Sequence, residues 1–433
     1  MTLLDLTPRA TTTPRLDTLP VVVIGAGPVG LASAANLVER GIDVIVLEAG
    51  DTPAAAVRRW GHIRLFSPWR HLIDPASRRL LAAAGWTEPD TDAAPTGREL
   101  VESYVTPLAE LDALRPRIRY GSRVVAVARE GMDRTRSTGR ETTPFLVRYV
   151  TADGAAELTA RAVIDASGTY NSPNPLGSTG LAPLGGSGLG DRLVHPLPDV
   201  LGVDRARFAG RHTTVVGAGH SAANTLLSLA TLAESEPGTR ITWLIRNASA
   251  MRVSSSADDE LADRAALGSR LDALVRRGTI EKIDSFEIGS VERHGDGVRL
   301  CGMRRGAASV HDADLVVAAT GFRPDLSMLR EIRLGLDDIV EAPVRLAPLI
   351  DPNVHSCGTV EPHGFDELRH PKHGFFIVGM KSYGRAPTFL LATGYEQVRS
   401  VAAWIDGDMR AATQVRLTLP ATGVCSTDLG GCC

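Results

Sequence analysis

The chain has 433 residues, which is enough for two or three domains, each with its own hydrophobic core. Its residues are 43% hydrophobic and 22% charged, which is ordinary for a globular protein. The formal net charge of −3 argues against nucleic acid or an anionic membrane as a partner.

The first recognisable element is a strand of apolar, mostly β-branched residues at positions 21–24 that runs into a glycine-rich turn. The three glycines of this turn permit a sharp bend, close approach of the backbone to a pyrophosphate, and close packing of the next helix on the sheet. A second apolar strand, residues 44–47, ends on Glu48, where such folds hold the adenosine ribose hydroxyls. The pattern predicts a dinucleotide site formed by Gly25, Gly27, Pro28, Gly30 and Glu48.

The region after this unit is expected to alternate loops with regular elements. Residues 60–69 mix aromatic residues, cations and turn formers, which suits either a loop that lines a large planar ligand or a packed surface loop. A helix is expected over residues 97–114, followed by strands near 124–127 and 145–150. The segment 129–143, rich in charge, threonine and glycine, predicts an exposed hairpin connection.

An apolar strand that ends in small residues occurs twice, at residues 162–168 and 315–321. The two copies bracket a second glycine-rich turn, and small residues at such ends let the chain pass close to a cofactor or cross between domains. The stretch 171–190, rich in glycine and proline, is therefore predicted to lead into a second domain, and residues 319–324 to lead back out of it.

The second glycine-rich turn follows a strand at residues 213–216 and differs from the first in two ways. Its third glycine is replaced by Ala222, which the motif tolerates. The next apolar strand ends on Arg246 and not on an acid, and a guanidinium there suits a ribose phosphate, so NADPH is favoured over NADH. The alternatives are that Arg246 is only a solvated charge, or that Arg252 takes its role. The candidate residues around this nucleotide are Gly217, Gly219, His220, Ser221, Arg246 and Gly321.

A last strand of the first domain is expected at residues 375–379, before a helix at residues 390–405. The segment between them should run against the flavin, which makes Gly379 and Lys381 candidate cofactor residues. Lys381 or Arg385 near the pyrimidine edge of the flavin would favour the anionic reduced ring. The alternative is that both are surface cations.

The five cysteines are unevenly placed. Cys301 lies in an expected strand and is predicted to be a core thiol, whereas Cys357 is either a thiol that faces the flavin or a buried structural residue. Cys425, Cys432 and Cys433 crowd the end of the chain. Three thiolates on a mobile strap suit a soft ion such as arsenite, mercury or copper(I), or a dithiol relay from reduced flavin. The alternative is a disordered end without a role.

The order of these motifs resembles the flavoproteins with two dinucleotide-binding domains, and among them the flavin-containing monooxygenase-like branch. The resemblance covers roughly residues 20–405 and implies FAD on the first turn, NADPH on the second, and hydride transfer between the domains. The segment around Cys357 and the cysteine-rich end further resemble flavin monooxygenase-like proteins of actinobacterial arsenic-resistance clusters. That resemblance implies an arsenical or another soft-metal species as substrate.

Two departures from these families bear on function. Flavin-containing monooxygenases carry a histidine signature before the second turn, which Gly190, His195 and Pro196 approximate poorly, so His195 is expected to be an ordinary linker residue. Disulfide reductases carry a Cys-x-x-Cys, which is absent here, and an acidic residue after the last strand, where this chain has Met380.

We therefore predict an α/β fold with two Rossmann-like dinucleotide-binding domains, the NADPH domain being inserted into the FAD domain. A signal-peptide core is absent from the N-terminal stretch, so a cytoplasmic location is expected. The expected parts are a flexible arm (1–19), the first part of the FAD domain (20–190), the NADPH domain (205–312), the second part of the FAD domain (313–410) and a cysteine-rich tail (411–433).

Three functions remain open from the sequence. The favoured one is an NADPH-dependent FAD monooxygenase that oxygenates a soft heteroatom such as sulfur, nitrogen or arsenic. The second is a thiol, disulfide or metal(loid) reductase, and the third is a soft-metal sensor or scavenger in which the flavin is incidental. The expected partner is a small-molecule or metalloid substrate, without nucleic acid or membrane, and a homodimer is left open. The reductase would use Cys357, Cys425, Cys432 and Cys433 as catalytic thiols, and the sensor would bind its ion through Cys425, Cys432 and Cys433.

Overall fold

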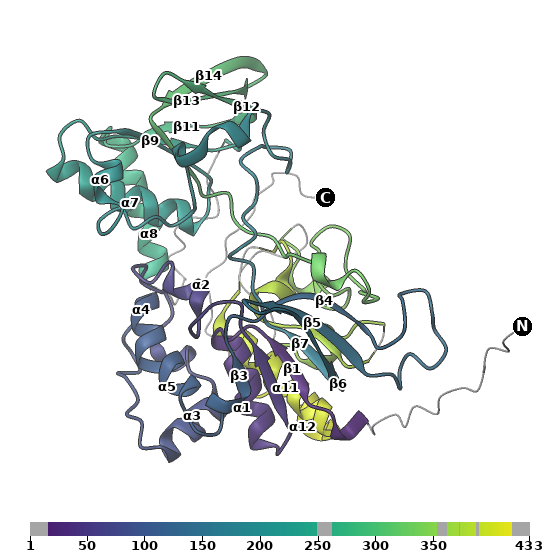
Figure 1. The fold of residues 1–433 in the computed structure, drawn as a ribbon. Helices are drawn as coiled ribbons and strands as arrows, with labels where there is room; N and C mark the ends of the chain where they lie inside the picture. The colour runs from purple at the N-terminus through teal and green to yellow at the C-terminus, as the bar shows by residue number, and fades with distance from the viewer. Residues whose placement is uncertain (1–15, 249–261, 353–361, 372, 387–388, 418–433) are drawn as a thin grey trace, which may run out of the picture.

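A computed structural model describes residues 16–248, 262–352, 362–371, 373–386 and 389–417 (Figure 1). It contains two parallel five-stranded sheets and two antiparallel three-stranded sheets. The predicted α/β fold with two dinucleotide-binding units is confirmed. No helix within these ranges is long and apolar enough to cross a membrane.

The sheet of the first domain has the strand order β16-β7-β1-β2-β3 and is parallel throughout. All four residues of β1 are buried, because Val21 and Val23 pack against helices on one face of the sheet, whereas Val22 and Ile24 pack against the antiparallel strands of residues 123–160 on the other. The strands expected at residues 21–24 and 44–47 are confirmed, and the strand expected at residues 162–168 ends earlier, at Asp165. The five strands are β1 (Val21–Ile24), β2 (Val44–Leu47), β3 (Ile118–Arg119), β7 (Ala162–Asp165) and β16 (Phe375–Ile377).

The helices of the first domain pack against one face of this sheet (Figure 1). The expected helix at residues 390–405 is confirmed as α11 (Leu391–Asp406), which packs along α1 (Pro28–Glu39). The expected helix at residues 97–114 ends early and changes type, since α4 passes through a π-helical turn, Val101–Val105, into α5. The remaining helices are α2 (Ala55–Arg58), α3 (Pro75–Ala83), α4 (Gly97–Leu100), α5 (Thr106–Ala109), α9 (Ala347–Ile350), α10 (Phe365–Leu368) and α12 (Met409–Thr413).

The second domain repeats this plan with the strand order β11-β10-β9-β15-β8 (Figure 1). Its central strand β9 is buried at every position, and α7 follows it directly after the second glycine-rich turn. The strands are β8 (Leu193–Val194), β9 (His212–Val216), β10 (Arg240–Leu244), β11 (Glu281–Ile283) and β15 (Leu315–Ala318). The helices are α6 (Arg205–Phe208), α7 (His220–Ser235) and α8 (Ala262–Arg276).

Two of the expected domain boundaries are corrected by the strand pairing. β15 pairs in parallel with β9, so it belongs to the second domain, although the boundary at residue 313 put it in the first. β8 pairs with β15, which brings residues 193–194 into the second domain as well. The chain therefore returns to the first domain only after Ala319. The expected arm at residues 1–19 lies mostly outside the described residues, and Leu16–Thr18 form a 3-10 helix.

Each domain also carries a three-stranded antiparallel sheet. In the first domain its strands are β4 (Arg123–Arg129), β5 (Phe145–Thr151) and β6 (Gly154–Ala160). In the second domain they are β12 (Phe286–His294), β13 (Gly297–Arg304) and β14 (Ala307–Ala313). The β4–β5 connection is mostly exposed, as predicted, but it is also fastened to the body of the domain. Arg140 is 2% exposed and donates to the carbonyl oxygen of Glu331 at 2.7 Å, and Arg333 donates to that of Arg134 at 2.8 Å.

A buried carboxylate, Asp74, caps α3 on the flank of the first domain. It is 1% exposed and accepts hydrogen bonds from the backbone N–H and the hydroxyl of Ser77, at 2.7 and 3.0 Å, and from Asn36 at 3.3 Å. Burial outweighs these bonds and raises the pKa of Asp74 to about 6. The folded protein therefore binds a proton here more tightly than the unfolded chain does.

This shift makes stability depend on pH in a defined direction. The folded-state pKa of about 6 lies above the ordinary value of 3.8. The contribution of Asp74 to the free energy of unfolding is therefore largest below pH 3.8 and falls as the pH rises, by up to about 3 kcal/mol once the pH is above 6. We expect the stability of D74N to vary less than that of the wild type between pH 5 and 7.5, because asparagine keeps a capping oxygen without the charge. The difference between their urea midpoints, followed across this range, measures the effect, and a constant difference would contradict it.

Candidate cofactor-binding site

The first glycine-rich turn lies at the carboxyl end of β1 and is pressed against the end of β7. Gly25 has a φ of +100°, and a Cβ there would lie 2.9 Å from the carbonyl oxygen of Ala166, so glycine is required. A Cβ on Gly27 would meet no atom within 4 Å, so the backbone is open to a ligand at that point. Pro28 then begins α1, whose N-terminal amides favour an anion. The turn fits a dinucleotide pyrophosphate.

Glu48 lies one residue beyond β2, beside the same turn. Its carboxylate oxygens accept hydrogen bonds from the backbone N–H of Ala26 at 2.7 Å and of Gly50 at 2.8 Å. A carboxylate oxygen has more than one acceptor position, so Glu48 can hold the turn and still accept from ribose hydroxyls. Its place at the edge of the sheet fits the role that its sequence position predicts.

The second turn repeats this geometry against the end of β15. Gly217 has a φ of +137°, and any Cβ there would overlap the carbonyl oxygen of Ala319. Its own carbonyl oxygen accepts a hydrogen bond from the buried indole Nε1 of Trp243 at 2.8 Å. Gly219 is open, since a Cβ would meet nothing within 4 Å, and His220 and Ser221 are the first residues of α7. A ligand can therefore approach the backbone at Gly219, next to the start of α7.

Arg246 lies two residues beyond β10, at the edge of the second sheet that carries this turn. Its exposed guanidinium donates to the carbonyl oxygen of Ser178 at 2.9 Å. Ser178 belongs to the segment that leads from the first domain into the second, so Arg246 is held at the domain junction. The group has further N–H donors for a ribose phosphate. Arg252, the alternative candidate, lies outside the described residues.

Lys381 forms half of a buried ion pair, so the alternative that it is a surface cation is wrong. It lies in the 3-10 helix Gly379–Tyr383, and its Nζ is 2.7 Å from Asp165 Oδ2 and 3.1 Å from Ser167 Oγ. The Lys381 and Asp165 side chains are 1% and 0% exposed. The other oxygen of Asp165 accepts from the N–H and hydroxyl of Ser167. The pair joins the ends of β7 and β16 beside the first turn.

The Asp165 partner was not singled out from the sequence, although a carboxylate that ends an apolar strand was a usable signal. For Arg385 the surface alternative holds, because its side chain is 41% exposed and pairs with Glu341 at 2.7 Å. Whether Lys381 contacts a flavin stays a prediction.

Gly379 is held by a buried polar network that sequence reasoning missed. Its N–H donates to Gln397 Oε1 at 2.8 Å, and Gln397 Nε2 donates to the hydroxyl of Ser382 at 2.9 Å. Gln397 and Ser382 are both 0% exposed. A single glutamine within the apolar face of α11 carries no sequence signal that distinguishes this role. The network fixes the segment after β16 against α11.

Gly321 lies in the segment that leads back from the second domain to the first. This segment is hydrogen-bonded to the one that leads from the first domain into the second. The carbonyl oxygen of Gly321 accepts from Asn174 N–H at 2.9 Å, and the Asn174 side chain donates to the carbonyl oxygen of Thr320 at 3.1 Å. Beside them the rings of Tyr170 and Phe322 lie 5.4 Å apart, and that of His195 lies 4.9 Å from Tyr170. His195 directly follows β8, so it lies at the carboxyl end of the second sheet and packs at the crossing; its role as an ordinary linker residue stays a prediction.

The cysteine predictions fall mostly outside the described residues: Cys357, Cys425, Cys432 and Cys433 all do. Cys301 is described and lies in β13, as expected, but it is half-buried and not a core residue. Within the described ranges no group of three histidine, cysteine or acidic residues is arranged to hold a metal ion. The predicted thiol and metal roles therefore stay predictions.

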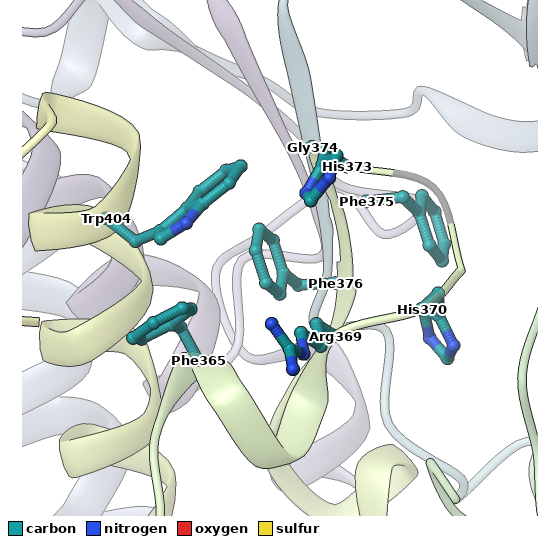
Figure 2. Close-up of a pocket in the computed structure, with 8 residues that line it drawn as sticks. All are labelled: Phe365, Arg369, His370, His373, Gly374, Phe375, Phe376 and Trp404. Atoms are coloured by element: carbon teal, nitrogen blue, oxygen red, sulfur yellow. The ribbon is translucent and has the colours of Figure 1, made fainter. Parts of the chain in front are cut away.

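A small cavity lies at the start of β16, away from the carboxyl ends of the strands where the glycine turns are (Figure 2). Its volume of about 30 Å³ is close to that of one water molecule, so it does not suit an organic substrate. It is lined by Phe365, Arg369, His370, His373, Gly374, Phe375, Phe376 and Trp404.

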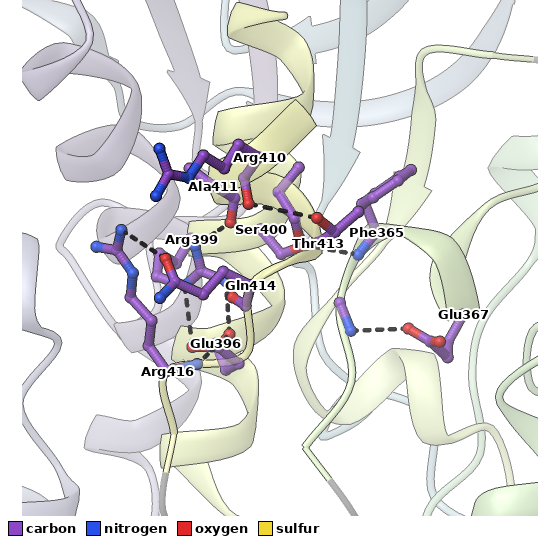
Figure 3. Close-up of polar contacts among 12 residues, drawn as sticks. Phe365, Glu367, Glu396, Arg399, Ser400, Arg410, Ala411, Thr413, Gln414 and Arg416 are labelled. Carbon is purple, nitrogen blue, oxygen red and sulfur yellow. Dashed lines mark hydrogen bonds and ion pairs between the residues drawn. The ribbon is translucent and has the colours of Figure 1, made fainter. Parts of the chain in front are cut away.

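The last described residues are fastened to α11 (Figure 3). Arg399 pairs with Glu396 at 2.6 Å and donates to the carbonyl oxygen of Ala411 at 2.7 Å, and Glu396 also accepts from the N–H of Arg416 at 3.2 Å. Two residues before Glu396, Gly394 packs so closely on the first turn that a Cβ would lie 2.9 Å from Val29. Residues 411–417, the described start of the predicted tail, are therefore held against the helix that adjoins the first turn.

Comparisons with known proteins agree with this geometry. The profile of the family described as pyridine nucleotide-disulphide oxidoreductase matches residues 22–344. Rifampicin monooxygenase from Rhodococcus hoagii is 29% identical over 156 residues, which cover 33% of this chain and 32% of that protein. The chain thus aligns with about a third of this curated relative.

Solved structures share the fold over most of their length. Bacillithiol disulfide reductase Bdr (YpdA) from Bacillus cereus superposes with a TM-score of 0.66 at 22% identity and covers 90% of this chain and 99% of its own. The FAD-bound cadaverine monooxygenase DfoA from Erwinia amylovora superposes with a TM-score of 0.64 at 13% identity, over 94% and 98% of the two chains. A reductase and a monooxygenase are thus almost equally close in fold.

The buried ion pair generates a stability prediction. Lys381→Met leaves the Asp165 carboxylate buried without its cation, so we expect the free energy of unfolding to fall by about 3–5 kcal/mol. Replacing both residues, as K381M with D165N, removes both charges and should restore most of that loss. Urea unfolding of the three proteins measures this, and equal midpoints for K381M and the wild type would contradict it.

Proposed function

The chain belongs to the pyridine nucleotide-disulphide oxidoreductase family and is an FAD-dependent enzyme, and we propose that it is an NADPH-consuming monooxygenase that oxygenates a soft heteroatom. The substrate class that we favour is an arsenical. FAD, when bound, accepts a hydride from the nicotinamide and passes the electrons on to oxygen or to a disulfide.

The residues at the first turn would bind FAD, and those at the second turn would bind NADPH. Gly27 and the start of α1 would receive the FAD pyrophosphate, and Glu48 would accept from the adenosine ribose. Gly219 and the start of α7 would receive the pyrophosphate of NADPH, with Arg246 at the ribose phosphate. Both turns lie at carboxyl ends of parallel strands, which is where open α/β sheets bind such ligands.

The observation that favours oxygen as the electron acceptor is the placement of thiols. The sequence contains no Cys-x-x-Cys. Cys301, which the structure describes, lies in β13 of the antiparallel sheet, paired with Val310 and Ser290, and not at either glycine turn. The described part of the site therefore offers no cysteine thiol to receive electrons from the flavin. The reaction balances as substrate, O₂, NADPH and a proton giving oxygenated substrate, NADP⁺ and water.

The choice of an arsenical rests on chemistry outside the described residues. The tail carries three cysteines within nine residues, and thiolates are preferred ligands of soft metalloids. Trivalent arsenic also has a lone pair that can accept an oxygen atom. The tail would then deliver a thiol-bound arsenical to the site.

A second candidate function is reduction of a disulfide or metal(loid), and it is favoured by the position of the residues from which the tail extends. Arg416 is held at Glu396, two residues from the contact of Gly394 with the first turn. Cys425 follows nine residues after Arg416 and can reach about 30 Å from it, because an extended chain spans at most 3.3–3.6 Å per residue. The segment between Arg416 and Cys425 is thus long enough for the tail thiols to approach a flavin held at that turn. In this case NADPH and a proton reduce one disulfide to two thiols.

One experiment separates the two functions. The holoenzyme is reduced with NADPH and then given oxygen with or without a trivalent arsenical, while oxygen uptake, peroxide and pentavalent product are measured. Monooxygenation predicts one product per oxygen consumed and little peroxide. Stoichiometric peroxide without product would contradict it. The chain with Cys425, Cys432 and Cys433 replaced by serine serves as the comparison, and loss of disulfide-dependent NADPH oxidation in that variant would support the reductase.

The preference for NADPH generates a second prediction. Arg246→Ala should raise KM for NADPH by about 10- to 100-fold, the worth of one or two charge-assisted hydrogen bonds, and leave KM for NADH nearly unchanged. Arg240→Ala is the matched control, because Arg240 is an exposed arginine at the opposite end of the same strand. Equal effects of R246A on both nucleotides would show that Arg246 does not bind the phosphate.

A further inference from the structure

Phe66 reaches from the first domain to the nucleotide turn of the second. Its ring centroid lies 5.3 Å from that of His220, and the two planes are tilted by 57°. Phe66 also packs against the apolar core of the second domain, which includes Val215 and Ala222. His220 begins α7, directly after Gly219. The contact therefore lies beside the amides that would bind a pyrophosphate.

The loop that carries Phe66 is rooted in the first domain. The N–H of Leu65 donates to the carbonyl oxygen of Pro95 at 2.8 Å, and that of Trp69 donates to Ala93 at 3.0 Å. Trp69 is 4% exposed and belongs to the core of the first domain. Phe66 thus lies in a segment that is hydrogen-bonded to the first domain at Leu65 and at Trp69. Separating it from His220 requires either rotation of its side chain or a shift of one domain against the other.

The domains are also joined by the paired crossings around Asn174 and Gly321 and by the bond from Arg246 to Ser178. The crossings involve short extended segments, which can turn more easily than a packed core interface. Phe66 and His220 lie away from the crossings in sequence and touch the turn itself. Their contact is therefore placed to link the arrangement of the domains to occupancy of the second turn.

We propose that Phe66 covers the nicotinamide-dinucleotide turn and that binding of the nucleotide separates Phe66 from His220. This inference rests on the proposed function, in which the second turn binds NADPH. While the Phe66 ring contacts His220, a pyrophosphate can bind only if this aromatic contact is broken, and the lost contact energy weakens nucleotide binding. Removing the ring removes that cost, so a smaller side chain strengthens nucleotide binding. An aromatic pair of this kind corresponds to about a 2- to 10-fold change in Kd.

The test titrates the FAD-loaded enzyme with NADP⁺, the product nucleotide, so that no turnover occurs. We expect Phe66→Ala to bind NADP⁺ about 2- to 10-fold more tightly than the wild type, and Phe66→Leu to lie between them. Arg64→Gln is the matched control, since Arg64 is exposed on the same loop and bonds to the carbonyl oxygen of Ala94. Its Kd should equal that of the wild type. FAD content and urea midpoint establish that each variant is folded. If F66A does not fold, the comparison is made with F66L instead.

The outcomes are distinguishable. If neither the wild type nor any variant binds NADP⁺ or NADPH, the proposed function fails. If the wild type binds NADP⁺ and F66A binds it equally or more weakly, the second turn is a nucleotide site but Phe66 does not cover it, and the inference is overturned. Tighter binding by R64Q to the same extent as F66A would also overturn it, because the effect would then belong to the loop and not to the ring.

Discussion

Each glycine turn is pressed against the end of the neighbouring strand, and the rest of the molecule is arranged around these two close approaches. Gly25 abuts Ala166 after β7, and Gly217 abuts Ala319 after β15. These strand ends are also the points from which the chain crosses between the domains. The backbone that shapes each cofactor turn is therefore continuous with the backbone that sets the domain junction. A side chain at either glycine would disturb both.

The ion pair of Lys381 and Asp165 changes the electrostatic expectation for this site. A lysine near a flavin would favour the anionic reduced ring through its net positive charge. Here the ammonium lies 2.7 Å from a carboxylate of equal burial, so the pair presents a dipole and little net charge. Its main effect is then to hold the ends of β7 and β16 together beside the first turn. The Gln397 network acts on the same segment from the side of α11.

The path of electrons follows from these placements. In the proposed function they would enter at the second turn and pass to the first, and the described residues place no cysteine thiol there to carry them onward. Oxygen is a diffusible acceptor that needs no such relay, which is why we propose oxygenation. The alternative remains tied to the tail, whose root on α11 lies beside the first turn. The monooxygenase and the reductase thus differ in what approaches the flavin and share the same fold.

The amino-acid sequence by itself determined both turns, the strands that precede them, the acid after β2 and the helix at the end of the first domain. These features depend on local backbone geometry and on short periodic patterns, so a few consecutive residues specify them. Only the tertiary structure decided that β15 belongs to the second sheet, because strand pairing joins segments far apart in the chain. It also paired Lys381 with Asp165 across 216 residues and Asn174 with Thr320 across 146. The contact of Phe66 with His220 is of the same kind. No local pattern encodes such contacts, since each depends on how whole elements pack.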